Sequence, residues 1–111
     1  MNTLKDGELY WREQEAKECF KTYLRMAEMY EEMNDYETAS YFHQRCLDIS
    51  IDFKYTEGEA LAHKGLGISE EKVFNKFEAM NHLETALGKA SEGQLNDIHR
   101  NISRDLVRVY Q

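Results

Sequence analysis

Residues 34–49 read NDYETASYFHQRCLDI, and this stretch sets the character of the whole chain. Asn34 and Asp35 are a typical turn signal, because short polar side chains hydrogen-bond neighbouring backbone groups. Ala39 and Cys46 follow seven residues apart, which places two small side chains on one face of a helix. Small side chains on a shared face let a second helix approach closely. The stretch therefore predicts a turn that leads into one helix of a packed pair.

The same pattern returns with a period of 40 residues. Under this shift Ala39, Cys46 and Leu47 fall on Ala79, Ala86 and Leu87, Met26 falls on Leu66 and then Leu106, and two shifts carry Tyr30 onto Tyr110. Self-similarity at such a period is the signature of stacked helical repeats.

Helical spacing of apolar residues predicts five helices. Their expected ranges are 9–33, 36–52, 58–71, 75–90 and a last helix within 93–111. The chain has no proline, and its commonest residues are good helix formers. The segment SEEKVFNKF (69–77) blurs the turn expected between the third and fourth helices. With 111 residues the chain is long enough for one domain, and the fold class expected is all-α over 1–111.

The charge distribution argues against nucleic acid as a partner. The net charge is −7; residues 1–40 carry 5 basic and 10 acidic side chains, whereas residues 89–111 carry 4 basic and 3 acidic ones. An acidic surface repels phosphate backbones. The N-terminal stretch has no apolar signal-peptide core, and no run of about 18 apolar residues predicts a membrane span. Two cysteines, Cys19 and Cys46, are expected to be reduced and buried, which predicts a cytoplasmic protein.

Residues 26–47 resemble the tetratricopeptide repeat, a helix–turn–helix unit. The resemblance rests on Met26-Ala27-x-x-Tyr30, Asp35-Tyr36-x-x-Ala39 and Cys46-Leu47, and the 40-residue pitch is similar to the Leu-Gly-Asn variety of polarity adaptors. It implies a short right-handed α-solenoid of about five antiparallel helices. The implied units cover about 20–52 and 58–90, with a half unit at 93–111.

A narrower set of residues resembles a tetratricopeptide repeat protein of motile cilia. It comprises Phe42-x-x-Arg45-Cys46-x-x-Ile49, Glu59-Ala60, Gly65-Leu66 and Asp105 to Tyr110. This resemblance implies a cilium or flagellum axoneme as the location, and dynein or microtubule-associated proteins as partners.

Candidate chemical sites are few. His43 and Cys46 lie three residues apart and could face one metal ion, although a closed zinc site needs four ligands. Cys46 fills a small position of the repeat, so we expect no metal, no cofactor and no catalytic residue. Gly65-Leu66-Gly67 lacks the Gly-Lys-Ser/Thr of a phosphate loop, and close helix packing is its expected purpose.

A partner groove is expected along the first helices of successive units, the concave surface of such stacks. The residues expected to line it are Leu24, Glu28, Leu61, Lys64, Ile68, Arg104 and Arg108. In the chaperone-binding repeats this surface clamps a carboxylate with lysine and asparagine. Leu24 and Glu28 stand in their place, so no chaperone clamp is expected. Tyr10 and Trp11 are expected to cover or contact the end of the stack.

The sequence thus predicts a non-catalytic scaffold that binds a helical or extended segment of a larger protein complex. A structural subunit of an axonemal assembly is one interpretation. A peptide-binding cytosolic adaptor of the polarity-adaptor type is another, although Ile68 replaces the asparagine that this variety carries. A small metal protein using His43 and Cys46 is the third. The chain could also be a fragment of a longer repeat array.

Overall fold

The structure is a computed structural model that describes the backbone of residues 6–111 and the side chains of residues 12–111. Its described part is all-helical, as predicted. The five helices are α1 (Asp6–Glu32), α2 (Tyr36–Asp52), α3 (Thr56–Lys72), α4 (Lys76–Glu92) and α5 (Asn96–Tyr110). The expected ranges differ from these by a few residues at the ends, and Ser91 and Glu92 still belong to α4.

Four turns of one geometry join the helices. Each places a non-glycine residue in the left-handed region, with φ between 52° and 65°, and these residues recur every 20 positions: Asn34, Lys54, Phe74 and Gln94. Each turn also returns a backbone N–H across the helix end, as from Asp35 to the Tyr30 carbonyl at 2.9 Å and from Asn75 to the Glu70 carbonyl at 2.9 Å. This closure is that of a Schellman motif. The 40-residue period is therefore two 20-residue steps of the backbone.

The turn within 69–77 is as regular as the other three. Phe74 donates its N–H to the Glu71 carbonyl at 3.1 Å, as Asn34 does to Glu31 at 2.9 Å. The sequence blurs this turn because a phenylalanine takes the left-handed position that asparagine fills in the first turn. The residue types obscure this turn in the sequence, although its backbone geometry is the same as in the other three turns.

The small residues of the repeat lie inside the molecule. Ala27, Ala39, Cys46, Ala79 and Ala86 all have 0% exposure, which confirms the prediction that helices nest at these positions. Close packing also explains the glycine pair of α3. A Cβ on Gly67 would lie 2.8 Å from Leu83 Cγ, and one on Gly65 would overlap the His43 ring.

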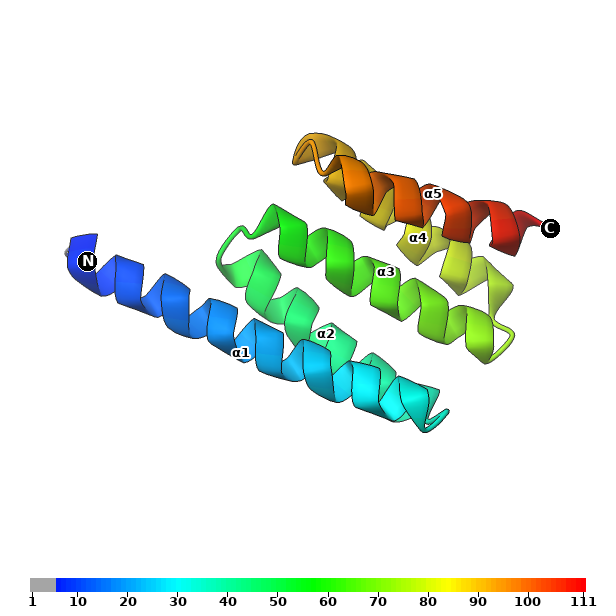
Figure 1. Ribbon diagram of the computed structural model, residues 1–111, viewed down its shortest axis with the longest axis horizontal. Coiled ribbons are helices and arrows are strands. Elements are labelled where there is room, and N and C mark those ends of the chain that lie inside the picture. The colour runs from blue at the N-terminus through cyan, green and yellow to red at the C-terminus, as the bar shows by residue number, and fades with distance from the viewer. Residues whose placement is uncertain (1–5) are drawn as a thin grey trace.

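The core has two clusters that meet at α3. One is built around Leu83, Ile102 and Leu106 and includes Ala60 of α3. The other is built around Phe20, Cys46 and Leu47 and includes Ala62 and Leu66 of α3. The described molecule is thus a row in which each helix contacts its chain neighbours (Figure 1).

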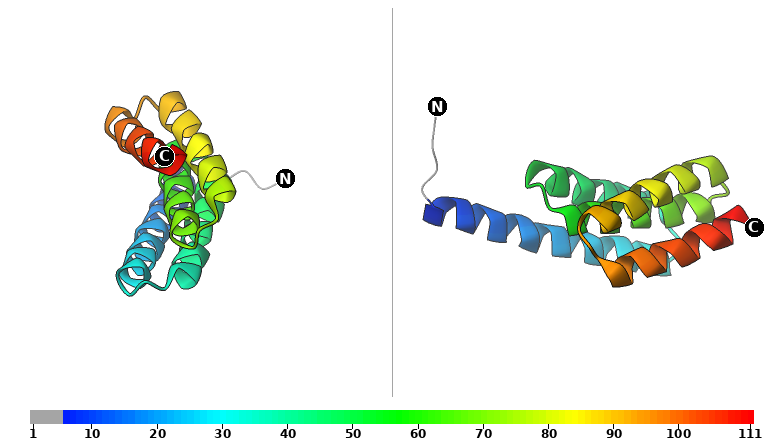
Figure 2. Two further views of the ribbon diagram at one scale, coloured as in Figure 1. Left: turned by 90° about the vertical axis from the view of Figure 1, so that its right-hand side faces the viewer. Right: turned by 90° about the horizontal axis from the view of Figure 1, so that it is seen from above.

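Helix α1 is longer than the rest, with 27 residues against 15 to 17. Its N-terminal half extends past the end of α2, in both the face-on view and the view from above (Figures 1 and 2). The α2–α3 turn lies toward this end, whereas the α1–α2 turn, the α3–α4 turn and residue 111 lie toward the other (Figure 1).

One cysteine prediction was wrong. Cys46 is buried, but Cys19 is exposed. Cys19 precedes the buried Phe20 in the part of α1 where α2 comes to its end, so its own face of the helix is uncovered. Both thiols are free.

Candidate functional site

The residues expected to line the groove fall into rows related by the 40-residue period. Leu24, Lys64 and Arg104 form one row across α1, α3 and α5, and Glu28, Ile68 and Arg108 form the next. Leu24 and Leu61 are half-buried and pack against the core, whereas Glu28 and Arg104 are exposed. The aliphatic members are therefore shallower anchors than expected, since part of each side chain is already used in the fold.

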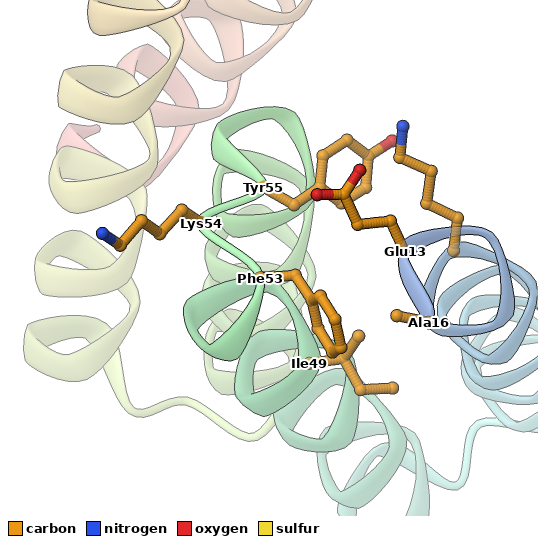
Figure 3. Close-up of a pocket in the computed structure, with 7 residues that line it drawn as sticks. Glu13, Ala16, Ile49, Phe53, Lys54 and Tyr55 are labelled. Atoms are coloured by element: carbon orange, nitrogen blue, oxygen red, sulfur yellow. The ribbon is translucent and has the colours of Figure 1, made fainter. Parts of the chain in front are cut away.

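A hollow that the sequence did not predict lies between α1 and the α2–α3 turn. Its volume is about 150 Å³. Figure 3 shows Ile49 and Phe53 on one side, Ala16 and Tyr55 on others, and the Glu13 carboxylate pointing into the opening. Its other lining residues are Lys17, whose Nζ lies 5.5 Å from the Tyr55 ring centre, and Lys54. The hollow therefore has a mixed lining, in which Ala16, Ile49 and Phe53 are apolar and Glu13, Lys17 and Lys54 are charged.

A second hollow adjoins the first and runs along α1. It shares Ala16, Ile49 and Phe53 with the first and continues to Cys19 and Tyr23. It exists because the N-terminal half of α1 extends past α2, so these side chains are not covered by another helix. Sequence periodicity gives no signal for it, because the regular helical spacing of apolar residues in α1 (Phe20, Tyr23, Met26, Ala27, Tyr30) begins only at Phe20.

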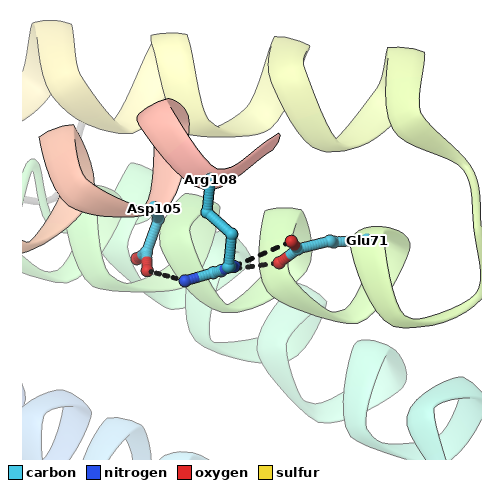
Figure 4. Close-up of polar contacts among 3 residues, drawn as sticks. All are labelled: Glu71, Asp105 and Arg108. Carbon is cyan, nitrogen blue, oxygen red and sulfur yellow. Dashed lines mark hydrogen bonds and ion pairs between the residues drawn. The ribbon is translucent and has the colours of Figure 1, made fainter. Parts of the chain in front are cut away.

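Arg108 is tied to neighbouring side chains by ion pairs, although its own side chain is exposed. Its guanidinium donates to Glu71 at 2.8 Å and 2.6 Å and to Asp105 at 3.0 Å, which ties α5 to α3 (Figure 4). The hydrogen bond from Arg108 holds the pKa of the Glu71 carboxyl below its usual value. Arg108 therefore serves the α3–α5 contact, whereas Arg104 is exposed and makes no ion pair among the described residues.

His43 and Cys46 are built into the core rather than into a metal site. His43 is 3% exposed and pairs through Nε2 with Glu31. The Cys46 thiol lies 3.6 Å from the Phe20 carbonyl oxygen, and burial raises its pKa to about 12. Metal binding needs a thiolate, which this environment opposes. Among the described residues, no group of three or more His, Cys, Asp or Glu side chains could hold a metal ion.

A histidine pair joins α3 to α4. His63 Nδ1 and His82 Nδ1 lie 3.2 Å apart, and the ring centres are 5.4 Å apart. The pKa of His63 is lowered to about 4, most of all by burial and in addition by the neighbouring His82 and Lys89. The sequence contained a signal for this pair, because a 40-residue shift carries Tyr23 and Phe42 onto His63 and His82, and those two rings stack with centres 6.0 Å apart.

The α3–α4 turn exposes two phenylalanines. Phe74 is 94% exposed and Phe77 is 71% exposed, and Val73 beside them is 53% exposed. The other three turns carry polar residues at the equivalent positions: Asn34, Lys54 and Gln94 for Phe74, and Glu37, Glu57 and Asp97 for Phe77. A shift of 20 residues would have revealed the difference from the sequence alone.

The side chains of Tyr10 and Trp11 lie outside the described residues, so their expected end contact is untested. Across the described helices, none has the length and apolar character needed to cross a membrane.

Comparisons with protein-family models, curated proteins and solved structures found no match to this chain.

Proposed function

We propose that this chain is a protein–protein interaction scaffold of the tetratricopeptide type, built as a short right-handed α-solenoid of antiparallel helices. The observation that carries the proposal is the recurrence of one turn geometry every 20 residues, with fully buried small side chains between the turns. A regular stack of helix pairs presents an extended surface of successive helices, and such surfaces bind other proteins. Cytosolic peptide-binding adaptors are built in this way.

The proposed groove runs over α1, α3 and α5. Leu24, Leu61 and Ile68 are its half-buried aliphatic contacts, and Lys64 and Arg104 are the groove cations that make no ion pair among the described residues. Arg108 is assigned to the α3–α5 ion pair instead, because Glu71 and Asp105 already neutralise it. A helical or extended segment with an acidic residue near its end fits this arrangement.

The experiment is affinity purification of the full chain from cell extract, followed by mass spectrometry. Arg104→Glu should remove the specific partners while circular dichroism stays helical. Arg100→Glu is the matched control, since Arg100 lies on the same helix, outside the two rows, in an exposed pair with Asp97 at 3.2 Å. If both variants lose the same partners, or if neither variant loses any, the proposed groove is contradicted.

A narrower proposal is that the assembly is ciliary. It is supported only by the resemblance of Phe42, Arg45, Cys46, Ile49 and the α5 residues to a protein of motile cilia. Recovery of dynein or microtubule-associated proteins from extracts of ciliated cells would support it. A set of companions drawn from other compartments would contradict the ciliary proposal and leave the scaffold intact.

A further inference from the structure

The histidine pair between α3 and α4 is not explained by packing. At the same positions the first repeat has Tyr23 and Phe42, whose rings stack with centres 6.0 Å apart. His63 and His82 put two polar imidazoles at half-buried positions, where an aromatic ring packs at lower cost. Among the described residues, neither imidazole bonds a side chain other than its partner. The fold therefore accepts other rings here and does not require two histidines.

The side chains around the pair have become polar as well. In the first repeat Tyr30 stacks on Phe42 with ring centres 5.6 Å apart, and Tyr41 meets Phe42 edge-on at 5.2 Å. A shift of 40 residues replaces Tyr30 with Glu70 and Tyr41 with Asn81, which is exposed. An aromatic cluster in one repeat is thus a polar cluster in the next, and a hydrated ion can approach it.

The separation of the two facing nitrogens fits one bound metal ion. The Nδ1 atoms of His63 and His82 lie 3.2 Å apart. Two imidazole nitrogens that each bind one Zn²⁺ at roughly 2.0–2.1 Å, with a near-tetrahedral angle between the bonds, lie about 3.1–3.4 Å apart. The ring centres are 5.4 Å apart, so the rings face each other almost in line. A slight rotation of each ring directs both nitrogen lone pairs to one point.

The charges beside the pair do not oppose a cation. Lys89 is near enough to His63 for its charge to act on that ring. Its ammonium is itself paired with Glu59 at 3.5 Å and with Glu92 at 3.4 Å. Glu59 precedes His63 by about one helical turn, on the same face of α3. Two carboxylates therefore stand against one ammonium, which leaves a net negative charge beside the imidazoles.

We propose that His63 and His82 bind one divalent transition-metal ion of the kind that imidazole prefers, such as Zn²⁺, through their Nδ1 atoms. The ring that donates in the pair carries its proton on Nε2 instead, so both bound rings are neutral. Water fills the remaining positions, since no group of three or more His, Cys, Asp or Glu side chains gathers among the described residues. Such an ion links α3 to α4, and neither histidine belongs to the scaffold groove.

The test adds Zn²⁺ at about pH 7.5 to the full chain after a chelator has removed any bound metal. In tenfold excess over its dissociation constant, Zn²⁺ should raise the melting temperature by roughly 5 °C, because the folded chain alone holds both ligands at the required separation. NMR of the ring nitrogens should show the Nδ1 signals of His63 and His82 shifting together. Mg²⁺, which binds oxygen ligands, should have no effect.

Copying the first repeat into the second tests which residues bind the ion. His63→Tyr with His82→Phe should keep the helical spectrum and lose the stabilisation by Zn²⁺. His82→Phe alone leaves one ligand and should weaken binding at least tenfold. The controls are His99→Gln, on α5, and Cys19→Ser, which removes the exposed thiol. Both controls should bind Zn²⁺ as the parent chain does.

Stabilisation by Zn²⁺ that persists in the double histidine variant, or that disappears in either control, would overturn the proposed site. A parent chain whose melting temperature and ring-nitrogen signals respond to none of Zn²⁺, Ni²⁺ and Cu²⁺ would overturn it as well. That outcome would leave the pair as a hydrogen bond between two neutral rings.

Discussion

The pair α1–α2 and the pair α3–α4 use one backbone plan with different side chains. At one position in the first pair, Tyr23 stacks on Phe42 at 6.0 Å; at the same position in the second, His63 faces His82 at 5.4 Å. The first contact joins two aromatic rings, whereas the second includes His63, whose pKa is lowered to about 4, mainly by burial. Equivalent geometry therefore gives the two pairs different responses to acid.

The buried contacts between the two helices of each pair, called seams below, also differ in polarity. In the second pair Gly67 meets Leu83, which is fully buried. In the first pair the equivalent residues are Ala27 and His43, and His43 keeps a polar partner in Glu31. In the second pair the contact between Gly67 and Leu83 is apolar, and the contact between His63 and His82 is polar. In the first pair the arrangement is reversed, since His43 is polar and the Tyr23–Phe42 contact is aromatic. The repeat fixes side-chain size and spacing more strongly than polarity.

The largest effect is expected from removing the apolar seam of the second pair. Leu83→Ala should lower the free energy of unfolding by about 3 kcal/mol, because Gly67 opposite has no side chain to fill the cavity. Leu87→Ala, at a half-buried position of α4, is the control and should cost about 1 kcal/mol. Urea titration followed by circular dichroism measures both. Equal losses would show that Gly67 and Leu83 are not the close contact.

Acid should destabilise the second pair through His63. The folded chain holds His63 neutral, with its pKa lowered to about 4, while the unfolded chain protonates it near 6.5. The contribution of neutral His63 to the free energy of unfolding is therefore fully present above pH 6.5. As the pH drops toward 4, the free energy of unfolding falls by on the order of 2 kcal/mol for this half-buried ring.

The control for this prediction copies the first pair into the second. His63→Tyr with His82→Phe should remove the decline between pH 6.5 and pH 4 when unfolding is measured at matched pH. Lys89, held by Glu59 at 3.5 Å, is unchanged in this variant. A decline of the same size in the double variant would place the acid sensitivity elsewhere.

Two glycines should respond in opposite directions to the same substitution. Gly67→Ala should lower stability by about 1–2 kcal/mol, since its Cβ would press against Leu83 and lie 3.2 Å from the Ala79 carbonyl oxygen. Gly88→Ala should raise stability by up to about 1 kcal/mol, because nothing lies within 4 Å and alanine favours the helix. Thermal unfolding of both variants is sufficient, and stabilisation by both would contradict the close α3–α4 packing.

The smallest effect concerns the turns. Phe74→Asn should raise the free energy of unfolding by up to about 1 kcal/mol, because asparagine takes the left-handed conformation at lower cost. Asn34→Phe, the reverse exchange in the first turn, should lower it by a similar amount. Both variants are measured at the same low protein concentration. A loss on Phe74→Asn would mean that the ring contributes to the folded monomer.

Five helices, the turns near Asn34 and Gly93, and the nesting of Ala27, Ala39, Cys46 and Ala79 could all be predicted from the sequence. These features depend on side-chain size and helical spacing, which are local properties. The exposure of Cys19 and the capture of Arg108 could not, because they depend on where a neighbouring helix ends and on which carboxylates it presents.

The sequence by itself determined the helices and their period, since small residues every 40 positions leave close packing as the way to bury the apolar stripes. Only the tertiary structure decided which polar groups meet. It paired His63 with His82 and Arg108 with Glu71, buried His43 against Glu31, and left Phe74 uncovered above a strained turn. The period of the sequence determines which face of each helix is buried. Whether two charged or aromatic side chains meet also depends on the register between two helices, and packing determines that register.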